Sequence, residues 1–129
     1  MKTILVIDDD PIMRDTIRDI LQAEGYNIII ASNGKEGMAH MGNKTIELIL
    51  TDVLMPEKDG IEVIMETKLK HPLVKILAIS GGGYISGENY LKMARDLGAN
   101  ASVIKPFDID DLVAEVNRLL GNDKQPKAS

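Results

Sequence analysis

Apolar residues along this chain fall into short runs that alternate with longer segments of helical periodicity. The runs are rich in β-branched residues and apolar on both faces, a pattern typical of strands in a parallel sheet that helices cover on each side. Five runs meet this description, and they predict strands over Thr3–Ile7, Asn27–Ala31, Glu47–Asp52, Lys75–Ser80 and Ala101–Ile104.

The segments between the runs repeat apolar residues three and four positions apart, which predicts amphipathic helices. They cover about Pro11–Glu24, Gly34–Met41, Asp59 to the residues before Pro72, Gly87–Leu97 and Asp108–Leu120. Each of the four clearer helices should bury one apolar stripe: Met13, Ile17, Ile20 and Leu21 in the first, Ile61, Ile64, Met65 and Leu69 in the third, Leu91, Ala94 and Leu97 in the fourth, and Leu112, Val116, Leu119 and Leu120 in the last.

Two aspartates stand where helices are expected to begin. Asp10 precedes Pro11, and proline is favoured at the first helical position behind an aspartate N-cap. Asp59 has a glutamate three residues later, which forms a capping box. Because Asp10 has a sufficient structural role as a cap, the neighbouring Asp8 and Asp9 are the acids that need another explanation.

The alternation of five strands with five helices predicts an α/β protein with right-handed crossovers and helices on both faces of a parallel sheet. Among doubly wound folds, the flavodoxin-like (βα)5 fold with strand order 2-1-3-4-5 fits five strands. Ligands in such a sheet bind beyond the carboxyl ends of the strands, at the switch point between the first and third. Asp8 and Asp9 follow the first strand and Asp52 ends the third, so the acids lie where a site is expected.

Two further polar residues end strands of the predicted sheet, Ser80 on the fourth and Lys105 directly after the fifth. Taken singly, each has an ordinary interpretation as a turn or surface residue, but all of them converge on one edge. Three carboxylates about 5 Å apart repel one another by roughly 3 kcal/mol per pair, so a proton or a cation must offset the repulsion. With oxygen ligands alone, the expected cation is Mg²⁺, with Mn²⁺ as a substitute.

Composition narrows the class of protein. The chain has 129 residues, the size of one domain with a substantial core. A net charge of −5 and few aromatic residues argue against binding to nucleic acid or to an anionic membrane. The chain has no cysteine, which excludes disulfides and a cysteine nucleophile. Without an apolar run long enough to span a bilayer or the pattern of a signal peptide, the cytoplasm is the expected location.

In their order and spacing, these motifs resemble the receiver domains of two-component response regulators. The resemblance covers about residues 3 to 120 and rests on Asp8-Asp9, the run DVLMPEKDG over 52–60, Ser80 and Lys105-Pro106-Phe107. It implies a phosphorylation-dependent signalling switch rather than an enzyme. Residues 1–121 would form the receiver domain, and residues 122–129 a polar tail or the start of a linker.

The resemblance implies that Asp52 accepts a phosphoryl group from the phosphohistidine of a sensor histidine kinase or of a phosphotransfer protein. Asp9, Asp52 and the backbone carbonyl of Leu54 would then bind Mg²⁺. Asp8 would contribute to the metal site through a water molecule.

Other residues of the motif would contact the phosphoryl group. By the resemblance, these are Ser80, Gly81 and Lys105, and the Lys105–Pro106 peptide bond is expected to be cis. One position departs from the family pattern, because Ser102 stands where the best-known members have an aromatic residue that changes rotamer on activation. Backbone shifts after the fourth strand are therefore expected to carry any output.

The resemblance also implies a downstream protein target or effector domain, contacted through the fourth helix, the fifth strand and the fifth helix. The chain would be a monomer or a weak phosphorylation-dependent dimer.

One alternative function is that of a Mg²⁺-dependent phosphatase or phosphotransferase with an aspartate nucleophile, acting on a small molecule. Such an enzyme usually needs a second acid where this chain has Leu54. Another is a flavodoxin-like cofactor carrier, whose phosphate the acids Asp8, Asp9 and Asp10 would repel.

Overall fold

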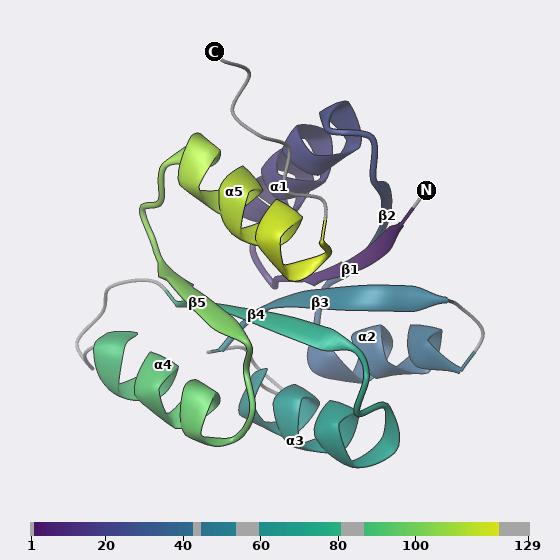
Figure 1. The fold of residues 1–129 in the computed structure, drawn as a ribbon, viewed down its shortest axis with the longest axis vertical. Coiled ribbons are helices and arrows are strands. Elements are labelled where there is room, and N and C mark those ends of the chain that lie inside the picture. The colour runs from purple at the N-terminus through teal and green to yellow at the C-terminus, as the bar shows by residue number, and fades with distance from the viewer. Residues whose placement is uncertain (1, 43–44, 54–59, 81–86, 122–129) are drawn as a thin grey trace.

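Five parallel strands form one sheet in the order β2-β1-β3-β4-β5 (Figure 1). The computed structural model describes residues 2–42, 45–53, 60–80 and 87–121, without the side chains of 87–91. The strands are β1 (Thr3–Ile7), β2 (Asn27–Ala31), β3 (Ile46–Asp52), β4 (Lys75–Ser80) and β5 (Ala101–Ile104). The predicted flavodoxin-like fold and strand order are confirmed, and β3 begins one residue earlier than expected.

The five helices divide between the two faces of the sheet. They are α1 (Pro11–Ala23), α2 (Gly34–Met41), α3 (Gly60–Lys70), α4 (Gly87–Asp96) and α5 (Ile109–Leu119). Figure 1 shows α1 and α5 on one face and α2, α3 and α4 on the other. In the described part of the chain, no helix is both long and apolar enough to cross a membrane.

The predicted cap of α1 is present. The Asp10 carboxylate accepts hydrogen bonds from the backbone N–H groups of Ile12, at 3.0 Å, and Met13, at 3.4 Å. These bonds occupy two of the donors that a helix start leaves without helical partners. The other predicted cap, Asp59, lies outside the described residues.

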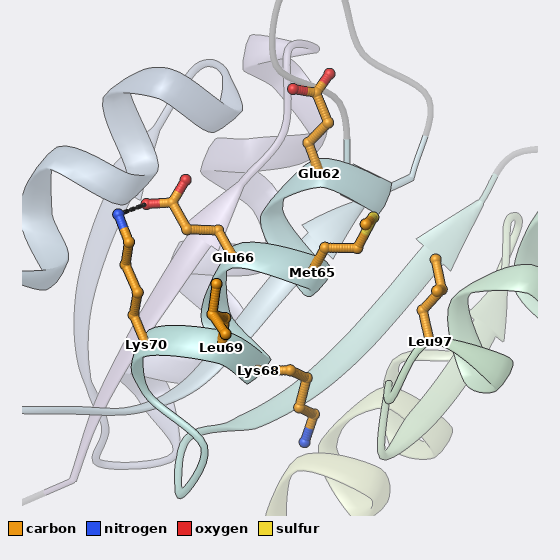
Figure 2. Close-up of a pocket in the computed structure, with 7 residues that line it drawn as sticks. All are labelled: Glu62, Met65, Glu66, Lys68, Leu69, Lys70 and Leu97. Atoms are coloured by element: carbon orange, nitrogen blue, oxygen red, sulfur yellow. Dashed lines mark hydrogen bonds and ion pairs between the residues drawn. The ribbon is translucent and has the colours of Figure 1, made fainter.

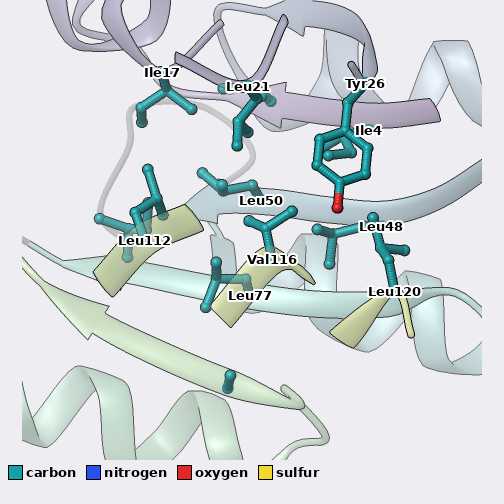
Figure 3. Packing of buried hydrophobic residues seen from close by; sticks show 13 residues of the cluster. Ile4, Ile17, Leu21, Tyr26, Leu48, Leu50, Leu77, Leu112, Val116 and Leu120 are labelled. Carbon is teal, nitrogen blue, oxygen red and sulfur yellow. The ribbon is translucent and has the colours of Figure 1, made fainter. Parts of the chain in front are cut away.

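The larger part of the core lies between the sheet and the pair α1 and α5 (Figure 3). Ile17 and Leu21 from α1 and Val116 from α5 meet Leu50 of β3 and Leu77 of β4, and all five are buried. The stripes predicted for these two helices are confirmed, since their remaining members are buried or pack half-buried against the same cluster.

The predicted stripe of α3 is wrong in part. Met65 is 53% exposed and Leu69 is 81% exposed, whereas Val63 and Thr67 are buried together with the predicted Ile64. Apolar residues occur on two faces of this helix, so periodicity alone could not choose the inner one. Ala94 of α4 is buried and Leu97, directly after α4, is half-buried as expected, while the side chain of Leu91 lies outside the described part.

Candidate functional site

The carboxyl ends of the adjacent strands β1 and β3 bring the three predicted acids together. The carboxylates of Asp8, Asp9 and Asp52 each place an oxygen within 4.8 Å of the others. Asp8 and Asp52 are buried, with 1% and 7% of their surface exposed, whereas Asp9 is exposed. The cluster therefore consists of two enclosed carboxylates and one that water can reach.

Lys105 supplies a positive charge to the enclosed pair. Its Nζ donates hydrogen bonds to Oδ2 of Asp52 at 3.0 Å and to Oδ2 of Asp8 at 3.1 Å, and its side chain is 17% exposed. Burial by itself lowers the pKa of this ammonium, but the charges and hydrogen bonds of Asp52 and Asp8 outweigh burial and raise the pKa above its ordinary value. Lys105 is therefore charged at neutral pH, and its charge lies between two carboxylates.

The backbone after β4 and β5 positions Lys105. Its N–H donates to the carbonyl oxygen of Ser80 at 2.8 Å, which extends the pairing of the two strands by one residue. The Lys105–Pro106 peptide bond is cis, as expected. Ser80 is the last residue of β4 and is fully buried, so it lies at the same edge of the sheet as the acids.

Asp8 is fixed from both sides. One carboxylate oxygen, Oδ1, accepts from the N–H of Asp10 at 2.9 Å, and the other accepts from Lys105. The Asp8 backbone N–H donates in turn to the carbonyl of Ala31 at 3.1 Å. These bonds hold the first acid of the cluster in one orientation toward Asp52.

Two residues shape the backbone beside Asp52: Thr51, which the sequence did not single out, and Gly60, which it gave only as the end of the motif over 52–60. Buried Thr51 donates its hydroxyl to the Asp52 carbonyl oxygen at 2.9 Å. Gly60 donates its N–H to the Val53 carbonyl at 3.0 Å, and a Cβ at Gly60 would stand 2.3 Å from the Asp52 carbonyl oxygen. A single sequence carries no signal of these two contacts, because each depends on how closely the chain segments approach one another.

The donor set of the cluster fits a hard divalent cation. Its three members are carboxylates, and oxygen ligands of this kind are the ones that Mg²⁺ and Mn²⁺ prefer. Of the other predicted site residues, Leu54 and Gly81 lie outside the described residues. The structure therefore brings together Asp8, Asp9, Asp52 and Lys105, with Ser80 at the same edge.

Comparison with known proteins places these residues in a family. Residues 4–117 match the model of the response regulator receiver domain. The chain is 30% identical to the transcriptional regulatory protein CpxR of Escherichia coli over 120 residues, which are 93% of this chain and 50% of that protein. It thus spans about half the length of that curated relative.

Solved structures show the same similarity. A CheY-like receiver domain protein from Methanospirillum hungatei has a TM-score of 0.84 at 28% identity, with 95% of this chain and 96% of that chain covered. The response regulator TrrA from Thermotoga maritima, in complex with Mg²⁺ and BeF, has a TM-score of 0.81 at 33% identity, with 92% and 99% covered. With its strand order, its acid cluster and a family match over most of its length, the chain belongs to the response regulator receiver domains.

Proposed function

We propose that this receiver domain is a phosphorylation-dependent signalling switch whose phosphoacceptor is Asp52. The observation that carries the proposal is the 3.0 Å contact between Asp52 and the Lys105 ammonium, beside two further carboxylates. Phosphoryl transfer depends mainly on positioning and on neutralising charge, and this arrangement offers both. The response regulator TrrA from Thermotoga maritima was solved in complex with Mg²⁺ and BeF. That complex supports the proposal that Mg²⁺ and a phosphoryl group bind together at the site of this chain.

In the proposed reaction, a carboxylate oxygen of Asp52 attacks the phosphorus of a phosphohistidine on a sensor histidine kinase or a phosphotransfer protein. The phosphorus–nitrogen bond breaks, its electron pair stays on the histidine nitrogen, and an aspartyl phosphate remains. Lys105 moves its hydrogen bond from Asp52 to an oxygen of the phosphoryl group, where its charge is needed. The Ser80 hydroxyl and the backbone of Gly81 are the further proposed contacts of the phosphoryl group.

The acid cluster is the proposed metal site. Asp9, Asp52 and the backbone carbonyl of Leu54 would hold Mg²⁺, or Mn²⁺ in its place, and Asp8 would act through water. When bound, the ion neutralises negative charge on the carboxylates and the phosphoryl oxygens. Exposed Asp9 gives such an ion access from water, whereas the enclosed Asp8 and Asp52 fix its position.

The proposal extends to the rest of the chain. Residues 1–121 form the receiver domain, and 122–129 are a polar tail or the start of a linker. The switch works in the cytoplasm and passes its state to a downstream protein or effector domain through α4, β5 and α5. It is not an enzyme for a small-molecule substrate, because the chemistry ends on its own aspartate.

Intact mass after incubation with acetyl phosphate and Mg²⁺ tests the proposal. The wild-type chain should gain one phosphoryl group, and the gain should disappear with EDTA and in Asp52→Asn. Asp10→Asn is the matched control, because it makes the same chemical change two residues from Asp8 and keeps an N-cap that is equally favourable for α1.

Two results would contradict the proposal. One is a wild-type chain that stays unmodified with several small phosphodonors. The other is an Asp52→Asn chain that is modified to the same extent as Asp10→Asn, which would place the phosphoacceptor elsewhere.

A further inference from the structure

Helix α3 presents apolar side chains to water. Met65 and Leu69 lie four residues apart, on the same face of the helix, and both are exposed. Leu97, after α4, lines the other side of an open pocket of about 790 Å³ that these residues border (Figure 2). Isolated exposed leucines are ordinary, but two neighbouring apolar residues beside a hollow form a surface that another molecule can fill.

The charges beside this apolar surface are arranged along α3. Glu66 and Lys70 lie on one flank and form an ion pair of 3.4 Å between Glu66 Oε2 and Lys70 Nζ (Figure 2). On the other flank, the stem of Lys68 crosses Gly98, since a Cβ at Gly98 would lie 2.8 Å from Lys68 Cε. The flank with Glu66 and Lys70 thus carries an acid nearer the start of the helix and a base nearer its end.

We propose that α3 is a self-association surface, on which two copies of this chain pack with their α3 helices antiparallel about a two-fold axis. With the axis midway between the levels of residues 67 and 68 along α3, Met65 of one copy lies near Leu69 of the other, and the reverse. On the flank, Glu66 of each copy then faces Lys70 of the other, because a two-fold axis between antiparallel helices keeps equivalent flanks on the same side.

The charge pattern is what selects a second copy as the occupant. On one flank, the helix has an acid nearer its start and a base nearer its end. When two copies pack antiparallel, the acid of each copy therefore lies against the base of the other. The two ion pairs within the helices become a network of four alternating charges across the contact, and Met65 and Leu69 lose contact with water. A partner helix with charges of a single sign would meet repulsion from either Glu66 or Lys70.

The contact is small, so the association is weak. A contact formed by one 11-residue helix of each copy is smaller than the stable interfaces that bury roughly 1,200–2,000 Å². Dimers should therefore form only at high protein concentration. The surface includes none of the acids at the carboxyl edge, so association needs neither Mg²⁺ nor a phosphoryl group and differs from the phosphorylation-dependent dimer expected from the family resemblance.

Sedimentation velocity from micromolar to millimolar protein, without Mg²⁺ or phosphodonor, tests the surface. Wild type should shift from monomer to dimer, and Leu69→Ser should weaken association about tenfold or more, since a two-fold contact loses the same central side chain twice. Ile109→Ser on α5 is the matched control, because Ile109 is also apolar and is 53% exposed. It should associate as wild type does.

Charge reversal tests the partner. Glu66→Lys places two bases on the flank and Lys70→Glu places two acids there, so each variant alone should stay monomeric at concentrations where wild type dimerises. An equimolar mixture of the two variants should dimerise, because the all-basic flank then meets the all-acidic one.

Each experiment has an outcome that overturns the proposal. A wild-type chain that is monomeric at millimolar concentration excludes self-association through α3. So does a dimer that Ile109→Ser disrupts and Leu69→Ser leaves intact. A mixture of the charge variants that sediments no faster than its components excludes the antiparallel register.

Discussion

At the scale of single residues, Lys105 acts as a cation that the chain itself supplies. It forms hydrogen bonds with two buried carboxylates that repel each other, and removing one partner of such a buried pair leaves a charge uncompensated. The site can therefore stay folded without a divalent ion. A phosphoryl group or a metal ion that enters must rearrange contacts that already exist.

The raised pKa of Lys105 predicts how this contact depends on pH. Because folding raises this pKa, the stabilisation is fully present below the ordinary lysine value of about 10.4 and is lost as pH rises through the folded value. Without divalent ions, the difference in free energy of unfolding between wild type and Lys105→Met should stay constant from neutral pH to about pH 9 and shrink above about pH 10.4. Urea unfolding at each pH measures it.

Lys105→Arg is the control for this prediction. An arginine keeps its charge throughout this pH range, so its difference from Lys105→Met should not shrink. If the difference in free energy of unfolding between wild type and Lys105→Met already fell between pH 7 and 9, a group other than Lys105 would cause the pH dependence.

Sequence reasoning located the polar residues of the site because each follows a recognisable strand. Once the strand order is inferred, the carboxyl ends of β1, β3, β4 and β5 must share one edge, which brings Asp8, Asp52, Ser80 and Lys105 into one region. The same reasoning could not find Thr51, whose buried hydroxyl donates to the Asp52 carbonyl, because such a bond depends on a side-chain rotamer.

At the scale of elements, the start of α3 shows how closely a helix can approach a strand. Gly60 lies against the carbonyl of Asp52 and the Cα of Val53, at distances that leave no space for a side chain. This contact, with burial of Val63 and Thr67, fixes which face of α3 turns inward. Periodicity succeeded for α1 and α5, which have one apolar stripe each, and was wrong in part for α3, which has apolar residues on two faces.

Gly60→Ala should therefore destabilise the chain by roughly 1–3 kcal/mol, the usual cost of overpacking. Its Cβ would stand 2.3 Å from the Asp52 carbonyl oxygen and 2.6 Å from the Val53 Cα, and backbone atoms cannot avoid it by changing rotamer. Urea unfolding midpoints measure the loss, and, under the proposed function, intact mass should show slower phosphorylation because Asp52 is displaced.

Gly42→Ala provides the comparison for that variant. Gly42 ends α2 with φ −72°, and a Cβ there has nothing within 4 Å, so alanine should be tolerated. If Gly60→Ala were as stable as Gly42→Ala, the close approach of α3 to β3 would not constrain the site.

At the scale of the whole molecule, binding of a metal ion to the folded state should stabilise it against unfolding. With Mg²⁺ at about ten times its dissociation constant, linkage adds roughly 1.4 kcal/mol, which raises the melting temperature by a few degrees. The melting temperature should rise with millimolar Mg²⁺ in wild type and in Asp10→Asn, and far less in Asp9→Asn. A wild-type melting temperature that does not respond to millimolar Mg²⁺ would contradict a metal site in the acid cluster.

The end of α5 is tied to the opposite edge of the sheet from the acids. Lys2, just before β1, donates its Nζ hydrogen bond to the carbonyl of Leu120, whereas Asp52 ends β3 at the carboxyl edge. A strand of five residues is about 17 Å long, and roughly that distance separates Asp52 from the point where the chain leaves α5. A structural change at the acid cluster therefore has to be transmitted along the length of the strands and helices before it alters the position of residue 121.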